Sequence, residues 1–76
     1  MTLKDWLDNF SEQLVELMED HEMTQQELAD KSGLSVGSIN AYIRKQTLPG
    51  VKALVNIADV FEISIDELMD FGDTID

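Results

Sequence analysis

The sequence predicts an all-α domain built from five helices, and three observations support this fold class. Apolar residues recur at three- and four-residue intervals along most of the chain, which is the period of a helix that lies against a core. Thr24 and Ser64 are each followed three positions later by a glutamate, the pattern of a capping box at a helix start. With 76 residues, 43% of them hydrophobic, and no cysteine, the chain has the size of one domain that folds without disulfides.

The first helix is expected to open at Thr2, because Asp5 lies three residues further on. A long amphipathic stripe then indicates one helix as far as His21. The stripe consists of Leu3, Trp6, Leu7, Phe10, Leu14, Leu17, Met18 and His21. Its N-terminal members have three interpretations: they pack on the domain's own core, form a dimer contact, or bind a membrane surface. The last is disfavoured because membrane-surface helices carry Lys and Arg, whereas this helix carries Asp and Glu.

Two short helices joined by a tight turn follow, and the rest of the chain is organised around them. Thr24 is the expected N-cap of the first, with Glu27 completing its capping box. This helix should end at Ser32, because Gly33 stands where a left-handed residue commonly terminates a helix. Ser35 is the expected N-cap of the second. The arrangement is a helix-turn-helix, and the inward stripe of its second helix consists of Ile39, Tyr42 and Ile43.

The C-terminal part of the chain predicts two further helices and a short tail. A polar connection over residues 45–50 contains Pro49, which interrupts helical structure. It leads to a fourth helix that is expected to be the central packing element. Its apolar residues are Val51, Leu54, Val55, Ile57, Ala58, Val60 and Phe61. Ser64 and Glu67 open a fifth helix, and residues 72–76 are expected to form a frayed tail, although Phe71 could pack back.

Together these features resemble the lambda-repressor-like family of helix-turn-helix proteins, of Cro/repressor type and also called the xenobiotic-response-element family. The resemblance extends over about residues 10–69. It is carried by Thr24, Gln25, Leu28, Ala29, Gly33, Ser35, Ile39, Pro49 and the run 63–68. It implies one five-helix lambda-repressor-like DNA-binding domain over residues 1–71, with the helix-turn-helix at its second and third helices. Because the first helix of the family usually begins near Phe10, residues 1–9 are expected to be a helical extension.

The sequence departs from the family pattern at several positions, three of which concern the internal ion pair and the end of the reading helix. The family usually carries an Arg in its first helix and a Glu near the end of the reading helix as an internal ion pair, and the matching residues here are Met18 and Ile43. Because both charges are replaced together, no unpaired ion remains, and we expect these two side chains to touch. Lys45 stands where the family usually has Gly, which predicts an unusual backbone at that corner.

The formal net charge of −11 is unfavourable for DNA binding, which normally uses a basic surface. The acids lie at the two ends of the chain: residues 1–22 and 51–76 each hold seven acids against one lysine. Between them, Glu27 and Asp30 are set against Lys31, Arg44 and Lys45, for a net charge of +1. The helix-turn-helix is thus the one stretch that is not acidic.

The family resemblance implies that the second helix of the motif reads the major groove of DNA. The base contacts would come from Val36, Gly37, Asn40 and Ala41. The contacts to the DNA backbone would come from Gln25, Ser35, Ser38, Arg44, Lys45, Gln46 and Thr47. An Asn side chain can pair with adenine, and a small apolar side chain can meet a thymine methyl. This helix is therefore expected to favour A/T base pairs. Val36 has a second interpretation, in which it packs against the turn.

Other kinds of chemistry have little support in the sequence. There is no Gly-rich phosphate loop and no nucleophile-elbow motif, and Ser35 has no base nearby, so we expect a non-enzyme without a cofactor or metal. His21, the only histidine, is expected to be a surface or cap residue. The chain has no membrane-spanning apolar run and no signal-peptide pattern, so a cytoplasmic location without membrane binding is expected.

We therefore predict a sequence-specific transcriptional regulator of phage or prophage repressor type. It would bind a short palindromic operator of double-stranded DNA as a homodimer. A second interpretation is an acidic helix-turn-helix kept for protein interaction, such as an antirepressor, an antitoxin or a DNA-mimic-like partner of a basic protein. The acidic ends favour the second interpretation, whereas Asn40, Arg44 and Lys45 within the motif favour the first.

Overall fold

The computed structural model describes residues 2–69 and confirms the all-α fold class, with five helices and no strand in that range. The predicted tail over 72–76 and the packing of Phe71 lie outside the described residues. The helices are α1 (Leu3–Asp20), α2 (Gln25–Ser32), α3 (Val36–Ile43), α4 (Val51–Val60) and α5 (Ile65–Leu68).

Local hydrogen bonds set the starts of the helices, as the sequence predicted. Capping boxes open α1, α2 and α5: in each, the N-cap hydroxyl accepts a hydrogen bond from the backbone N–H of an acid three residues later, whose carboxylate accepts one from the N-cap backbone N–H. The pairs are Thr2 with Asp5, Thr24 with Glu27 and Ser64 with Glu67. Ser35 caps α3 through the N–H of Ser38 at 3.0 Å, whereas Gly50 begins α4 without a side-chain cap.

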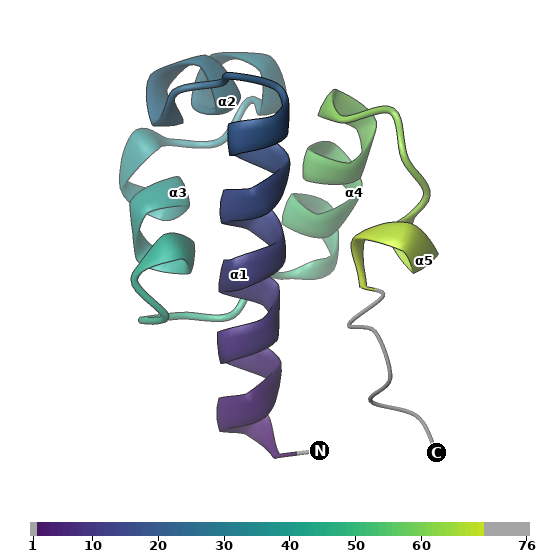
Figure 1. The fold of residues 1–76 in the computed structure, drawn as a ribbon. Helices are drawn as coiled ribbons and strands as arrows, with labels where there is room; N and C mark the ends of the chain where they lie inside the picture. Colours follow the sequence, from purple (N-terminus) through teal and green to yellow (C-terminus); the bar gives the residue numbers. More distant parts are fainter. Residues whose placement is uncertain (1, 70–76) are drawn as a thin grey trace.

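The helices pack around α1, the longest of them. In Figure 1, α1 runs down the middle of the view, with α3 on one side and α4 and α5 on the other, and α2 crosses near its C-terminal end. The helix pairs in contact include α1 with α3, α2 with both α3 and α4, and α4 with α5. One core joins them. It comprises Phe10, Leu14, Met18, Leu28, Ala29, Ile39, Tyr42, Ala53, Ile57, Ala58, Phe61 and Leu68.

The expectation that α4 is the central packing element stays a prediction: the helix contacts both α2 and α5, but it is buried on one side only. Only Ala53, Ile57 and Ala58 of this helix are buried, while Val51 is 77% exposed and Val55 is 45% exposed. The reason is geometric: α4 meets its neighbours with one face, and apolar residues at the edge of that face remain partly in water whatever their hydrophobicity. The largest fully buried side chains are contributed by all five helices, and α4 keeps exposed valines that its sequence did not distinguish from the core residues.

The N-terminal extension packs on the domain's own core through Trp6. The ring of Trp6 stacks on Phe10 with centroids 5.4 Å apart, and Phe10 meets the edge of Tyr42 at 6.0 Å. Leu7 is half-buried, whereas Leu3 is 64% exposed. Among the described residues of the extension, Leu3 is the one large exposed apolar side chain.

Three helices end on a non-glycine residue in the left-handed region. These residues are Glu22 after α1, Lys45 after α3 and Glu62 after α4, with φ between 50° and 61°. At each, the next backbone N–H returns to a carbonyl five residues earlier, as Ile63 does to Ala58 at 3.0 Å. This is the Schellman motif, in which glycine is the usual residue because a Cβ is strained there. The unusual backbone expected at Lys45 is thus confirmed.

Glu62→Gly is expected to raise the free energy of unfolding by about 1 kcal/mol, because it removes the Cβ strain of a left-handed residue. Glu62 is exposed and sits at φ 55°, so no packing is lost. Urea denaturation measures the change. Glu62→Ala is the matched control, since it removes the same charge and keeps the Cβ. If alanine stabilises the domain as much as glycine does, relief of charge rather than of backbone strain is the cause.

Candidate nucleic-acid interface

The turn between α2 and α3 is built as the sequence predicted. α2 ends at Ser32, and Gly33 takes the left-handed conformation at φ 75°. The Ser32 hydroxyl accepts a hydrogen bond from the Leu34 N–H at 3.2 Å, which fixes the chain just before Ser35 caps α3. Glycine is needed at position 33 for its φ and not for space, since a Cβ there would meet no atom within 4 Å.

The capping box of α2 also lowers the pKa of an acid within the motif. Hydrogen bonds from the backbone and side chain of Thr24 hold the pKa of Glu27 below its usual value. Because the folded-state pKa is lowered, the stabilisation is present above the pKa of an unfolded glutamate and is lost as the pH falls through the lowered value. The start of α2 is therefore fully capped at neutral pH.

Buried contacts fix the orientation of α3 on α1. Ile39 and Tyr42 are buried in the core, and Ile43 is half-buried. The buried hydroxyl of Ser11 donates a hydrogen bond of 2.6 Å to the backbone carbonyl of Ile43, at the end of α3. Because a serine at this depth needs a partner, this bond ties the C-terminal end of α3 to α1. The opposite face of α3 is consequently presented to solvent.

That outward face carries the predicted base-contact residues, but it does not expose all of them equally. Val36 is 37% exposed and Gly37 is exposed, whereas Asn40 and Ala41 are half-buried. A Cβ on Gly37 would meet only Ser35 Oγ, at 3.9 Å, so the position is open on its outer side. Val36 therefore has part of its side chain open to solvent and part covered by the protein.

Asn40 is held by a contact that the sequence did not predict. Its Nδ2 donates a hydrogen bond of 3.3 Å to Oε1 of Gln25, the first residue of α2. Two predicted DNA-contacting residues thus lie together on one surface, although they are 15 positions apart in the sequence. The bond leaves the Asn40 Oδ1 atom and one amide hydrogen available, which are the groups an asparagine uses to pair with adenine.

Some of the residues predicted to contact phosphate are exposed, whereas others already have a partner within the protein. Arg44, Gln46 and Thr47 are exposed after the end of α3, while Ser38 is half-buried and accepts a hydrogen bond from the Ser35 hydroxyl at 2.9 Å. Lys45 Nζ instead forms an ion pair with Asp8 of α1 at 3.4 Å. Both partners are partly exposed, so the pair is weak and a phosphate can compete for the lysine.

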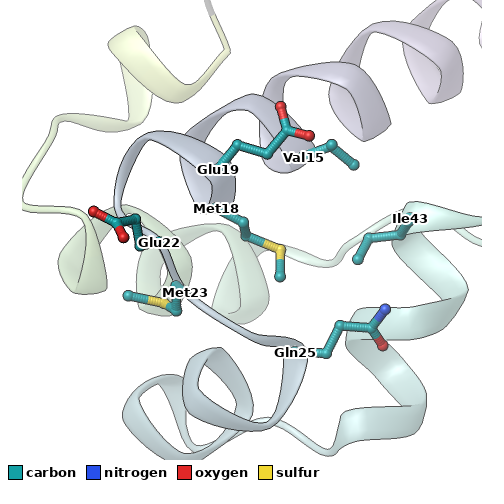
Figure 2. Close-up of a pocket in the computed structure, with 7 residues that line it drawn as sticks. All are labelled: Val15, Met18, Glu19, Glu22, Met23, Gln25 and Ile43. Carbon is teal, nitrogen blue, oxygen red and sulfur yellow. The ribbon is translucent and has the colours of Figure 1, made fainter.

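A hollow of about 320 Å³ lies behind this surface, where α1 ends, α2 begins and α3 ends. Figure 2 shows Met18 pointing from α1 towards the space between Met23, Gln25 and Ile43. Met18 and Ile43 line the same hollow, in which Val15, Glu19 and Glu22 complete the wall. The two residues that replace the usual ion pair therefore face one space, and their direct contact stays a prediction.

The remaining titratable residues give no sign of another kind of site. Within residues 2–69, no group of three or more His, Asp or Glu side chains could hold a metal ion. His21 is exposed and is the C-cap of α1, with its ring 5.0 Å from that of Phe61, so its prediction as a surface or cap residue is confirmed. No helix in the described range is both long and apolar enough to cross a membrane.

Comparison with known proteins supports the same motif. A family model described as Helix-turn-helix matches residues 14–68. An uncharacterized HTH-type transcriptional regulator of Bacillus subtilis, YqaE, is 35% identical over 60 residues, which are 79% of this chain and 52% of that protein. The cryptic phage CTXphi transcriptional repressor RstR of Vibrio cholerae is 49% identical over 45 residues, which are 59% of this chain and 40% of RstR. The chain thus spans about half the length of these relatives or less. No solved structure matches it significantly.

Proposed function

Because this chain belongs to the helix-turn-helix family, we propose that it is a transcriptional regulator of phage-repressor type that reads a palindromic operator as a homodimer. The observation that carries the proposal is the outward face of α3, where Val36, Gly37 and Asn40 lie on a helix fixed from behind by the core. A helix held in this way can enter the major groove with its N-terminal residues foremost. The names of both relatives refer to regulation of transcription, which also supports a non-enzymatic role.

The distribution of charge along the sequence supports DNA binding around α3. Residues 31–58 contain four of the five basic residues and no acid, and they include all of α3. The rest of the surface should repel phosphate, so non-specific binding is expected to be poor at physiological salt. Discrimination between operator and random DNA would then come from low background as well as from base contacts.

The test is a selection of operator sequences by the full chain at low salt, followed by two variants. Asn40→Ala should weaken operator binding by about 1–3 kcal/mol and relax the preference at one base pair, because it removes a base contact. Arg44→Ala should weaken binding to all sequences alike and lower the salt slope by about one per subunit, because it removes a phosphate contact.

Each variant has a matched control elsewhere in the fold. Asn56→Ala removes a half-buried asparagine from α4, and Lys4→Ala removes an exposed cation from the acidic start of α1. Neither control should change base preference, and Lys4→Ala should leave the salt slope unaltered. If selection enriches no sequence, or if Asn40→Ala and Arg44→Ala behave as their controls do, the regulator proposal fails. The acidic surface would then favour the protein-interaction alternative.

A further inference from the structure

An acid of α1 lies beside the predicted contacts to the DNA backbone. Arg44 and Lys45 are the two cations among those contacts, and Lys45 Nζ lies 3.4 Å from Oδ1 of Asp8. Within residues 2–69 this is the one ion pair between side chains, and Arg44 is exposed and takes no part in it. A carboxylate of the protein itself therefore already binds one of the two cations that the proposed interface offers to phosphate.

A buried contact one turn further along α1 sets the position of this acid. The Ser11 hydroxyl donates a hydrogen bond of 2.6 Å to the Ile43 carbonyl at the end of α3. Asp8 precedes Ser11 by three residues, so the two side chains lie on the same face of α1. The alignment of α1 with the end of α3 is thus fixed by a buried bond that involves neither Asp8 nor Lys45. Asp8 faces Lys45 because of that alignment, and not only because opposite charges attract.

The backbone at Lys45 is fixed, whereas its side chain can change partners. The Lys45 N–H donates to the Tyr42 carbonyl at 3.2 Å, and the Gln46 N–H donates to the Ala41 carbonyl at 2.9 Å. The side chain of Lys45 is 43% exposed and that of Asp8 is 36% exposed, so neither is enclosed by protein. A lysine is a point charge on a flexible stem, and its ammonium can turn from a carboxylate to a phosphate without any movement of the backbone.

We propose that Asp8 competes with DNA phosphate for Lys45 and thereby lowers the affinity of this domain for DNA of any sequence. The inference rests on the proposed function, because it assumes that the surface around α3 meets DNA. When Lys45 turns to a phosphate, its ion pair with Asp8 is lost, and the free carboxylate is left close to the negatively charged backbone. Both effects oppose binding. Phosphate contacts carry no sequence information, so operator and random DNA are affected alike.

The strength of the ion pair suits a residue that adjusts affinity without preventing binding. An ion pair between partly exposed side chains is weak, so a phosphate can displace Asp8 from Lys45. A buried pair would hold the lysine too firmly, because the acid left behind would be an unpaired buried charge. Asp8 belongs to the N-terminal extension, which therefore has a second role besides packing Trp6 on the core.

Binding of a random-sequence DNA duplex by the full chain, measured by fluorescence anisotropy at several salt concentrations, tests the proposal. Asp8→Asn should strengthen binding about two- to fivefold per subunit at low salt, the range that an exposed ion pair supports. Asp59→Asn is the matched control, because it removes the same charge from an exposed position on α4, which lies across α1 from α3 (Figure 1). The control should gain clearly less, since it changes only the overall repulsion of phosphate.

Two further measurements identify Lys45 as the residue through which Asp8 acts. In a chain that carries Lys45→Gln, Asp8→Asn should lose most of its gain, because the lysine for which Asp8 competes is gone. In the unmodified background the gain should shrink as salt is added, since salt screens both the ion pair and the repulsion between Asp8 and phosphate. Thermal melts should show every variant folded, because the three substituted side chains are at least partly exposed. An effect of Asp8 on folding alone would depend on neither Lys45 nor salt in this way.

The possible results separate this inference from the proposed function. If selection enriches no operator, but Asp8→Asn still strengthens binding of the random duplex through Lys45, the inference stands and sequence-specific reading fails. If an operator is found and Asp8→Asn gains no more than Asp59→Asn, the inference is overturned and the proposed function stands. A gain that is equally large in the Lys45→Gln background overturns it too. If neither the unmodified chain nor Asp8→Asn binds any duplex at low salt, both fail.

Discussion

Replacing Phe10 by alanine is expected to lower the free energy of unfolding by about 3–5 kcal/mol, the range for removing a buried aromatic side chain. Phe10 is 1% exposed, and its ring lies between Trp6 on α1 and Tyr42 on α3. The substitution therefore leaves a cavity at the junction that orients α3 and removes two aromatic contacts. Urea denaturation followed by circular dichroism measures the loss.

Two further variants make this result interpretable. Leu3→Ala changes an exposed residue on the same helix, and its effect should stay within about 0.5 kcal/mol. Phe10→Leu retains part of the volume and should fall clearly between the unmodified protein and Phe10→Ala, which gives a measurable value if the alanine variant does not fold. An effect of Phe10→Ala no larger than that of Leu3→Ala would show that the aromatic cluster does not hold α1 against α3.

Restoring only one member of the family's ion pair is expected to destabilise the domain almost as much as Phe10→Ala does. Met18→Arg should lower the free energy of unfolding by about 3 kcal/mol, near the lower end for an unpaired buried charge, because the adjoining hollow lets part of the side chain reach water. Met18 is buried, and Ile43 lines the same hollow. Adding Ile43→Glu should recover part of the loss, with a coupling energy of about 1–3 kcal/mol in a double-mutant cycle.

The cycle also tests whether positions 18 and 43 are close. Met18→Leu is the control, since it keeps the volume and polarity of the site and should cost less than about 1.5 kcal/mol. A coupling energy indistinguishable from zero would mean that the two side chains do not meet across the hollow. The expectation that they replace an ion pair would then have to be withdrawn.

The sequence by itself determined the features that depend on neighbouring residues. The three capping boxes and the left-handed Gly33 follow from hydrogen bonds that close within four residues, so their participants could be recognised by spacing alone. The same holds for the helix-turn-helix, whose two helices are separated by three residues. For the candidate site, the sequence could identify the residues on the outward face of α3, because helical spacing shows which residues share one face of a helix.

Only the tertiary structure decided which of those residues are available and where the apolar surface lies. The bond from Asn40 to Gln25, the pair between Asp8 and Lys45 and the bond from Ser11 to the Ile43 carbonyl all join residues at least 15 positions apart in the sequence. The exposure of Val51 and Val55 on α4 has the same origin. Such contacts depend on how the helices cross, which is set by the packing of the whole core, and helical periodicity cannot tell a face that meets another helix from one that meets water.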